Sequence, residues 1–187
     1  REFRYDVRVE PGRNEARVRA NLGLTFRNGT PSSGLPNAVI GPYDSRFAAG
    51  ENLSLLSIYT PSLVRQATLG EDEIRLGSNQ ELGRYVHAGE LDMPSKATAE
   101  MHLGLEGRVP LQAGWYYLDV IRQPTVRPDK VEVRIEVAPG WRIVDTLGVV
   151  QLTEQEAART LVLDRDTRVG VQLRRTGLMG MWDRLVR

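Results

Sequence analysis

Few side chains in this sequence combine the type and the spacing that enzyme chemistry requires. The chain contains no cysteine and two histidines, His87 and His102. The missing thiols exclude a cysteine nucleophile, a disulfide and a thiolate metal site. The two histidines lack the short spacing of a helical zinc motif, so a zinc site would need a carboxylate brought in by the fold. Because His102 falls on the polar side of an alternating segment, we expect a solvated histidine there and no metal.

Other common catalytic motifs are also absent. No serine lies in a G-x-S-x-G elbow, and no glycine-rich stretch has the spacing of a phosphate-binding loop. Two acidic stretches, Glu71-Asp72-Glu73 and Asp164-Arg165-Asp166, lie between strand-like segments, so we expect solvated hairpin tips. Calcium bound by their oxygen atoms is the alternative. We predict no catalytic residue, no metal and no cofactor; a hydrolase or transferase using scattered carboxylates is the rival hypothesis.

Aromatic side chains are the candidates for binding. Trp115, Tyr116 and Tyr117 are consecutive. Neighbouring residues of a strand point to opposite faces, so at least one ring must face away from the core. Tyr43 and Phe47 lie in the loop of residues 41–47. Exposed rings of β-domains can stack on sugars, and these five residues form our candidate glycan site; a core tryptophan with tyrosines at the rim is the alternative.

The overall charge is nearly balanced. The 187 residues include 25 Lys and Arg and 24 Asp and Glu, which gives a net charge of +1. No global field therefore attracts nucleic acid or an anionic membrane. No apolar run reaches the roughly 18 residues of a membrane-spanning helix. We expect neither nucleic acid as a partner nor a membrane span within this sequence.

Arginines gather on the polar face of one segment. Arg17, Arg19 and Arg27 share a face of the 17–27 segment, and residues 132–136 carry mixed charges on another segment. If the two segments are neighbours in a sheet, opposite charges would form a cross-strand ladder. A patch that binds an anionic polymer is the alternative.

The elements that must position these residues are strands. From Val18 to Phe26 every second residue is apolar, which is typical of a strand with one buried and one wet face. The other expected strands are residues 53–59, 64–69, 83–88, 97–105, 116–120, 131–137, 141–144, 161–163 and 168–174. About ten strands with wet outer faces predict an all-β fold, an antiparallel β-sandwich of immunoglobulin-like flavour with minimal helix.

Two segments predict short helices. Thr153-Glu154-Gln155-Glu156 resembles a capping box and predicts one or two helical turns. Residues 178–187 place apolar side chains on one side and predict a short helical tail, which would dock on the sandwich or touch a membrane surface. We predict one sandwich domain over residues 1–177 and a tail over 178–187. A subdivision near residues 107–114 is the alternative.

A series of strand and turn motifs is similar to that of a known family. The motifs are Phe26-Arg27-Asn28-Gly29-Thr30-Pro31, Gly41-Pro42, Leu56-Ser57-Ile58-Tyr59-Thr60-Pro61, Glu81-Leu82-Gly83-Arg84, Gly114-Trp115-Tyr116-Tyr117-Leu118, Arg122-Gln123-Pro124 and Val137-Ala138-Pro139-Gly140. Their order resembles the C-terminal part of the uncharacterised bacterial family catalogued as domain of unknown function 4012. The resemblance covers roughly residues 5–140 and places no catalytic motif on this chain.

The resemblance implies a cell-envelope protein. Family members look like proteins with an N-terminal membrane anchor and a larger N-terminal region similar to the LytR-CpsA-Psr phosphotransferases. The sequence opens Arg1-Glu2-Phe3, which we interpret as part of a longer chain. We therefore expect a non-enzymatic, extracytoplasmic module, anchored through an N-terminal segment, that supports assembly or binds an envelope protein or a surface glycan. An accessory domain of a glycopolymer hydrolase or transferase, and a structural spacer or oligomerisation block, are the alternatives.

Overall fold

The part of the chain that the structure describes folds into three β-sheets with one short helix. The computed structural model describes residues 1–42 and 44–177. Tyr43 and the expected tail helix of residues 178–187 lie outside the described residues. The described part contains fourteen strands and the four-residue helix α1 (Asn37–Ile40). None of its helices is long enough to cross a membrane.

Eight strands form the large sheet. Their order across the sheet is β12, β13, β10, β1, β2, β8, β4 and β5. Their bounds are β12 (Val150–Thr153), β13 (Glu156–Leu163), β10 (Asp129–Val137), β1 (Glu2–Pro11), β2 (Glu15–Arg27), β8 (Thr98–Pro110), β4 (Leu63–Leu69) and β5 (Asp72–Glu73).

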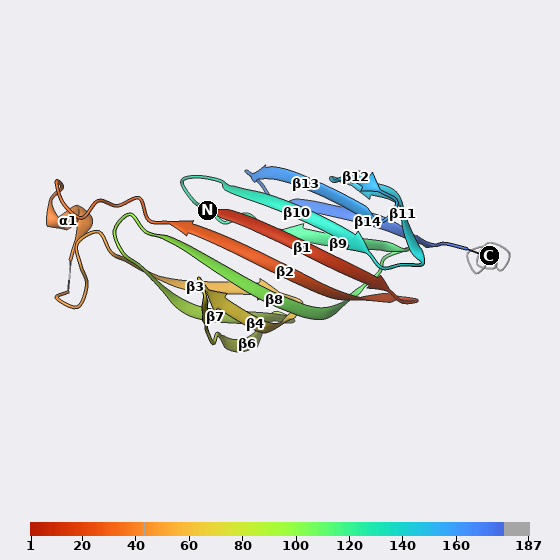
Figure 1. The fold of residues 1–187 in the computed structure, drawn as a ribbon, viewed down its shortest axis with the longest axis horizontal. Coiled ribbons are helices and arrows are strands. Elements are labelled where there is room, and N and C mark those ends of the chain that lie inside the picture. Colours follow the sequence, from red (N-terminus) through yellow and green to blue (C-terminus); the bar gives the residue numbers. More distant parts are fainter. Residues whose placement is uncertain (43, 178–187) are drawn as a thin grey trace.

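Two three-stranded sheets complete the described structure. The β9 sheet has the order β11, β14 and β9, and the β7 sheet has the order β3, β7 and β6. Their bounds are β11 (Trp141–Leu147), β14 (Thr167–Arg175), β9 (Trp115–Val120), β3 (Asn52–Thr60), β7 (Arg84–Met93) and β6 (Gly77–Glu81). The β9 sheet lies on the side of β10 and β13, and the β7 sheet on the side of β8 and β4 (Figure 1).

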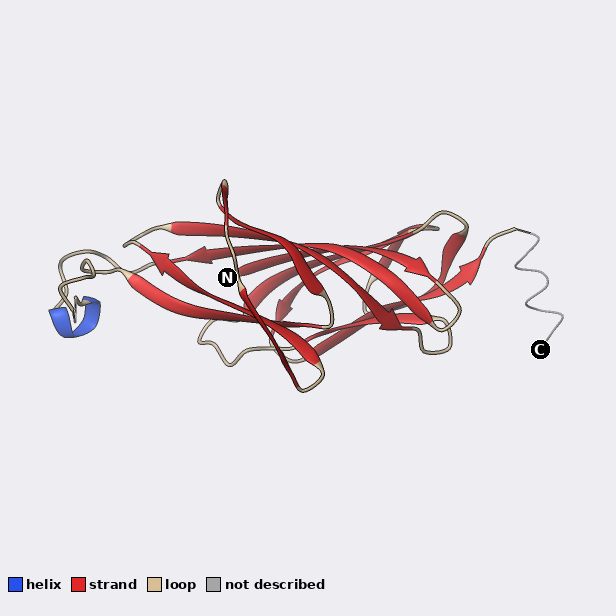
Figure 2. Cartoon of the chain, turned by 90° about the horizontal axis from the view of Figure 1, so that it is seen from below, coloured by secondary structure: helices blue, strands red, loops and turns tan. Residues whose placement is uncertain are grey.

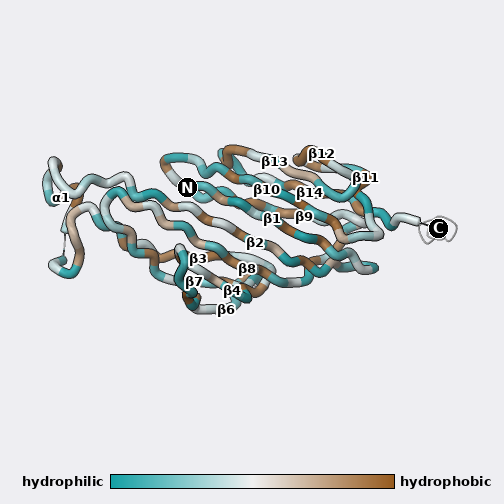
Figure 3. Tube along the Cα trace, viewed as in Figure 1, coloured by the Kyte–Doolittle hydropathy of each residue, from teal (hydrophilic) through white to brown (hydrophobic). Residues whose placement is uncertain are grey.

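One apolar core joins the three sheets. Alternate residues of the large sheet enter it, among them Val9, Leu103 and Ile135, each at most 1% exposed. The β9 sheet contributes Val171, and the β7 sheet contributes Leu91. Each such side chain stabilises the fold by about 1.5–3 kcal/mol relative to an exposed one. Apolar and polar residues alternate along the strands of the large sheet (Figure 3), so the face opposite the core, the outer face, is polar.

The structure confirms the all-β prediction, and all ten expected segments lie wholly or mostly within strands. It adds β1, β5, β6 and β12, which the pattern analysis did not list. The described strand pairs are antiparallel apart from β1 and β10, which are parallel, with Val7 opposite Ile135 and Val9 opposite Val137. Alternation shows which face of a strand is buried, but it contains no information on the direction of the neighbouring strand.

The predicted helix at Thr153–Glu156 is wrong. Thr153 ends β12, Glu154 and Gln155 form the turn, and Glu156 begins β13. The Thr153 hydroxyl accepts the backbone N–H of Gln155 at 3.2 Å, and the Gln155 carbonyl accepts the N–H of Val137 at 2.8 Å. A threonine hydroxyl satisfies the backbone of a tight turn as readily as that of a helix N-terminus. The following Ala157 is fully buried in the core, which holds the segment as a strand.

The loop between β2 and β3 is fastened at its base by Asn28. The Asn28 side chain is buried and donates to the carbonyls of Gly50 (2.7 Å), Met93 (3.1 Å) and Pro94 (3.0 Å), and it accepts the N–H of Thr30 at 3.0 Å. Figure 2 shows this loop, with the helix, at the end of the molecule opposite to residue 177, the last described residue of the chain.

The alternative domain boundary at residues 107–114 coincides with the end of β8 and the turn to β9. β8 continues to Pro110, and Gln112 and Trp115 exchange backbone hydrogen bonds of 3.1 and 3.0 Å.

Candidate functional site

A row of polar positions crosses the outer face of the large sheet. Strand register places Asp6 of β1 between Arg134 of β10 and Asn21 of β2. Asn21 lies opposite Gly104 of β8, which lies opposite Gln66 of β4. Because alternate residues of these strands enter the core, all five positions lie on the outer face. We call Arg134, Asp6, Asn21, Gly104 and Gln66 the polar row.

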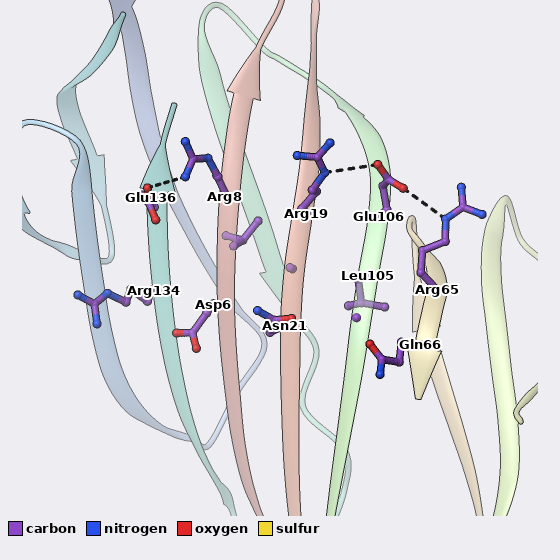
Figure 4. Close-up of a pocket in the computed structure, with 13 residues that line it drawn as sticks. Asp6, Arg8, Arg19, Asn21, Arg65, Gln66, Leu105, Glu106, Arg134 and Glu136 are labelled. Atoms are coloured by element: carbon purple, nitrogen blue, oxygen red, sulfur yellow. Dashed lines mark hydrogen bonds and ion pairs between the residues drawn. The ribbon is translucent and has the colours of Figure 1, made fainter. Parts of the chain in front are cut away.

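The neighbouring row carries ion pairs. Arg8 Nη1 lies 3.1 Å from Glu136 Oε1. Arg19 Nε lies 3.5 Å from Glu106 Oε1, and Arg65 Nε lies 3.4 Å from Glu106 Oε2. Figure 4 shows these pairs bordering the polar row.

A groove of about 510 Å³ follows the two rows. Gly104 contributes no side chain to its floor, while the longer arginines stand at its border. We call it the central groove. It is lined by Asp6, Val7, Arg8, Arg19, Ala20, Asn21, Arg65, Gln66, Gly104, Leu105, Glu106, Arg134 and Glu136. Five adjacent strands therefore build the groove, and nine of its thirteen lining residues have polar or charged side chains.

A bulge in β4 shapes one end of the groove. The pairing of β4 with β8 shifts between Val64 and Gln66, so that Val64 lies opposite Leu105 and Gln66 opposite Gly104. The extra residue, Arg65, is left without a direct partner, as expected for a β-bulge. Consecutive residues of a regular strand point to opposite faces, yet Arg65 and Gln66 both line the groove. The bulge thus brings a guanidinium and an amide to the same place.

Several polar atoms of the groove have no partner in the protein. Asp6 Oδ2 accepts Arg4 Nε at 2.9 Å, whereas Asp6 Oδ1 is shielded from solvent and makes no hydrogen bond. Within residues 1–42 and 44–177, the side-chain amides of Asn21 and Gln66 also make no hydrogen bond to the protein. A buried carboxylate oxygen without a donor is unfavourable, whereas the amides of Asn21 and Gln66 are exposed and open to an outside partner.

Glu106 is the electrostatic centre of the groove border. Arg17 Nε donates to Glu106 Oε1 at 3.0 Å, and Arg19 and Arg65 lie close by. The hydrogen bond and charge of Arg17, followed by the charges of Arg65 and Arg19, lower the pKa of Glu106. Glu106 is therefore ionised at neutral pH and is poorly suited to act as a general acid.

The five predicted aromatic residues do not form one site. Tyr43 lies outside the described residues. Phe47 is half-buried in the loop after α1, with the Arg46 guanidinium 5.6 Å from its ring centre. That loop is at one end of the molecule, apart from β9, which carries Trp115, Tyr116 and Tyr117 (Figure 1).

The three aromatic residues of β9 point to different faces, as the alternation predicts. Tyr116 is 2% exposed and shares a hydrogen bond with Tyr5, and burial raises its pKa well above the usual value. Trp115 and Tyr117 are half-buried and stack with ring centres 5.5 Å apart and planes 2° from parallel. The Arg168 guanidinium lies 5.2 Å from the Tyr117 ring centre. Tyr117 thus already has two neighbours for its ring, Trp115 and Arg168.

An ion pair extends this stack. Arg168 Nε and Nη2 donate to the two carboxylate oxygens of Asp119 at 2.6 and 2.9 Å. This hydrogen-bonded contact lowers the pKa of Asp119. The geometry fixes Arg168 beside Tyr117, as a two-pronged arginine–carboxylate contact does generally.

The two histidines lie in different sheets. His102 is exposed on β8, as predicted, while His87 of β7 is 3% exposed, with Nε2 3.3 Å from the Ser62 carbonyl oxygen. The acidic stretches occupy turns only in part: Glu71 lies in the turn between β4 and β5, whereas Asp72 and Glu73 form β5, and residues 164–166 lie between β13 and β14, as expected. The described residues contain no cluster of His, Asp and Glu that could hold a metal ion.

The charge ladder differs from the expected one. The arginine-rich strand β2 and the charged strand β10 are not neighbours, because β1 lies between them. β1 supplies the intermediate charges, with Arg8 paired to Glu136 and Glu10 to Arg19. The central groove was missed for the same reason: its residues come from segments far apart in sequence. The glycines of the outer face were the available signal, because they leave space between long polar side chains.

Comparison with known proteins leaves the family open. No family model matches the sequence, and no curated protein matches it. The structure of a Legionella pneumophila protein described as nutrient-binding is similar, with 8% identity and a TM-score of 0.46. The alignment covers 90% of this chain and 65% of the Legionella protein. An M1 zinc metallopeptidase from Deinococcus radiodurans is also similar, with 11% identity and a TM-score of 0.43, and the alignment covers 92% of this chain and 41% of the peptidase. The chain spans less than two thirds of either protein, and these likenesses support no assignment of activity.

Proposed function

We propose that this chain is a non-catalytic, extracytoplasmic binding module of a larger bacterial envelope protein, and that the central groove binds a surface glycan. The observation that carries the proposal is the set of accessible polar groups that line the groove: the exposed amides of Asn21 and Gln66, which make no hydrogen bond to another described residue, beside the partly exposed Asp6 carboxylate. An anchored N-terminal region, as in the family that the sequence resembles, would hold the module at the cell surface.

The carboxylate and amide groups of the groove match the hydrogen-bonding chemistry of sugar hydroxyls. A hydroxyl donates and accepts hydrogen bonds, a carboxylate oxygen only accepts, and an amide does both. A sugar that lies along the polar row would engage the amides of Asn21 and Gln66 at the same time. An open groove lined by many polar side chains suits an extended chain of sugars better than a compact apolar ligand, which prefers a concave apolar cavity.

The groove supports binding better than catalysis. Its carboxylates are held by arginines: Asp6 by Arg4, and Glu106 by Arg17, Arg19 and Arg65. A general acid needs a raised pKa, whereas the pKa of Glu106 is lowered. The groove therefore offers fixed hydrogen-bonding groups rather than a proton donor.

The groove is a better binding surface than the aromatic stack. Tyr116 is buried, and Tyr117 stacks on Trp115 and lies beside Arg168. A sugar on Tyr117 would displace one of these neighbours, whereas a sugar in the groove would fill sites that the protein leaves open.

A glycan array with purified protein, followed by calorimetry on the best ligand, tests the proposal. The double variant Asn21→Ala/Gln66→Ala removes both amides from the groove. The matched control Asn79→Ala/Gln80→Ala removes the same two amides from exposed positions of β6. We expect the groove variant to weaken binding at least about tenfold and the control to bind as the wild type does.

Three outcomes would contradict the proposal. One is the absence of any glycan that binds. Another is binding that both double variants retain but Trp115→Ala abolishes, which would move the site to the aromatic stack. The third is reproducible glycan cleavage or transfer by this chain, which would overturn the non-catalytic assignment.

A further inference from the structure

We infer that the glycan bound in the central groove carries a carboxylate, and that Arg65 and Gln66 at the β4 end hold it. This inference rests on the proposed function and specifies its ligand class as an acidic saccharide. The charges of the groove, the bulge in β4 and the partners of Arg65 support it.

Arginines outnumber carboxylates at the β4 end. Arg17, Arg19 and Arg65 share Glu106, and Arg19 also pairs with Glu10 at 3.2 Å. Three guanidinium groups therefore face two carboxylates, which leaves one positive charge in excess. An excess charge on a half-exposed face is favourable for a ligand of opposite sign, although salt screens the attraction.

Arg65 has hydrogen-bonding capacity to spare. Its Nε lies 3.4 Å from Glu106 Oε2, an ion-pair contact that lacks the geometry of a hydrogen bond, and its side chain is 62% exposed. A guanidinium offers five N–H donors in a fixed fork that matches a carboxylate. Because the bulge also directs Gln66 to the groove, its amide is available beside that fork.

The opposite end of the groove has the reverse balance. The arginines there are Arg4, Arg8 and Arg134, and the carboxylates paired with them are Asp6, Glu132, Glu136 and Glu156. Three positive charges against four negative ones leave one carboxylate in excess. An anionic group is therefore disfavoured at the β10 end. The charges orient the ligand, with hydroxyls toward β10 and the carboxylate toward β4.

The length of the groove favours an oligosaccharide. Four strand spacings separate β10 from β4, and at about 4.8 Å each they span about 19 Å. A single sugar ring cannot reach both Asp6 and Arg65, but a short chain can. The uronic acid unit would then lie at one end of the bound segment.

Calorimetry with oligosaccharides that carry a single uronic acid, at one terminal unit, tests the inference. The reference ligand is the same oligosaccharide after reduction of its carboxyl group, which removes the charge and preserves length and hydroxyls. We expect wild type to bind the acidic form about tenfold more tightly and to lose this preference at high salt. Arg65→Gln is expected to bind both forms equally, and Arg65→Lys to retain part of the preference.

The control variant is Arg27→Gln. Arg27 lies on the outer face of β2, pairs with Glu2 at 3.2 Å and does not line the groove. Its loss removes one positive charge from the same face, so a preference that falls equally in Arg27→Gln and Arg65→Gln reflects net charge alone and overturns the inference.

The remaining outcomes separate this inference from the proposed function. Equal binding of acidic and reduced forms by wild type, with loss of both in Asn21→Ala/Gln66→Ala, overturns the carboxylate and leaves glycan binding intact. Preference for a phosphodiester-linked glycopolymer over the uronic acid oligosaccharide also overturns the carboxylate. Failure to bind any of these saccharides overturns both.

Discussion

Asn28 shows how one residue can fix a long loop. Its buried amide group contacts three carbonyl oxygens, those of Gly50, Met93 and Pro94, and its carbonyl oxygen accepts the Thr30 N–H. Ser95 adds a hydrogen bond from its hydroxyl to the Thr30 carbonyl at 2.8 Å. The start and end of the β2–β3 loop are thereby tied to the turn between β7 and β8.

We expect Asn28→Ala to lower the free energy of unfolding by about 3 kcal/mol, because it leaves several buried backbone groups without a partner. Urea denaturation followed by circular dichroism measures this loss. Gln80→Ala, which removes an exposed amide from β6, serves as the control and is expected to change stability by less than about 0.5 kcal/mol. Equal stability of the two variants would show that the Asn28 contacts contribute nothing.

The sequence indicated Asn28 only as part of a turn. Asparagine next to glycine predicts a turn in any protein. The partners at Gly50, Met93 and Pro94 are 22 to 66 residues away, and local spacing holds no information about them. Exposure was easier to predict: His102 is solvated because its position in the alternation depends only on its own strand.

Glycines in the strands have two different roles. An added Cβ at Gly170 of β14 would lie 2.7 Å from the Tyr116 carbonyl oxygen and 2.7 Å from Tyr117 Cδ1. An added Cβ at Gly104 of β8 would meet Gln66 Cβ at 3.7 Å, an ordinary contact. Gly170 is therefore required by the close packing of β14 on β9, whereas Gly104 keeps the floor of the groove open.

We expect Gly170→Ala to destabilise the protein by about 2 kcal/mol, because the backbone of β9 must move to admit the methyl group. Gly104→Ala is the matched control, since it makes the same change within strand β8 of the large sheet, where the added methyl group meets no clash. Its stability is expected to equal or slightly exceed that of the wild type, because alanine restricts the unfolded chain. Thermal unfolding measures both, and a reversed order would contradict this account of the two sites.

At the level of elements, alternation is a reliable guide to strands and a poor one to turns. The long strands β2, β8, β10 and β14 were all expected from it. β1 shows the same pattern in Phe3, Tyr5, Val7 and Val9, so the information was present. The turn at Thr153–Glu156 was mistaken for a helix because its capping residues are common to both structures, and only the core contacts of Ala157 distinguish them.

At the level of the whole molecule, sheet order decides the site, and sheet order is what the sequence does not contain. The groove needs β10, β1, β2, β8 and β4 side by side. β1 and β10 are neighbours in the sheet but are separated by more than one hundred residues in sequence. Their parallel pairing can form only when the intervening chain has brought the two strands together. Pairings of this kind are set by the global packing of the core rather than by local pattern.

β1 has the most central place in this arrangement. It pairs with β2 on one side and β10 on the other, and its Val7 and Val9 are buried in the core. Without β1 the large sheet would divide into a β12–β13–β10 part and a β2–β8–β4–β5 part, each with a new unpaired edge. Unpaired edges next to an exposed core favour aggregation.

We therefore expect a chain that lacks residues 1–11 to show no cooperative thermal unfolding transition, as followed by circular dichroism in the near ultraviolet. Leu35→Ala, a change at a 48% exposed position of the β2–β3 loop, is the control and should retain the transition. Addition of a synthetic peptide of residues 1–11 should restore the transition, because the vacant position offers backbone partners on both sides. A cooperative transition in the shortened chain without the peptide would show that the two parts of the large sheet fold together without β1, and the central groove would then not depend on it.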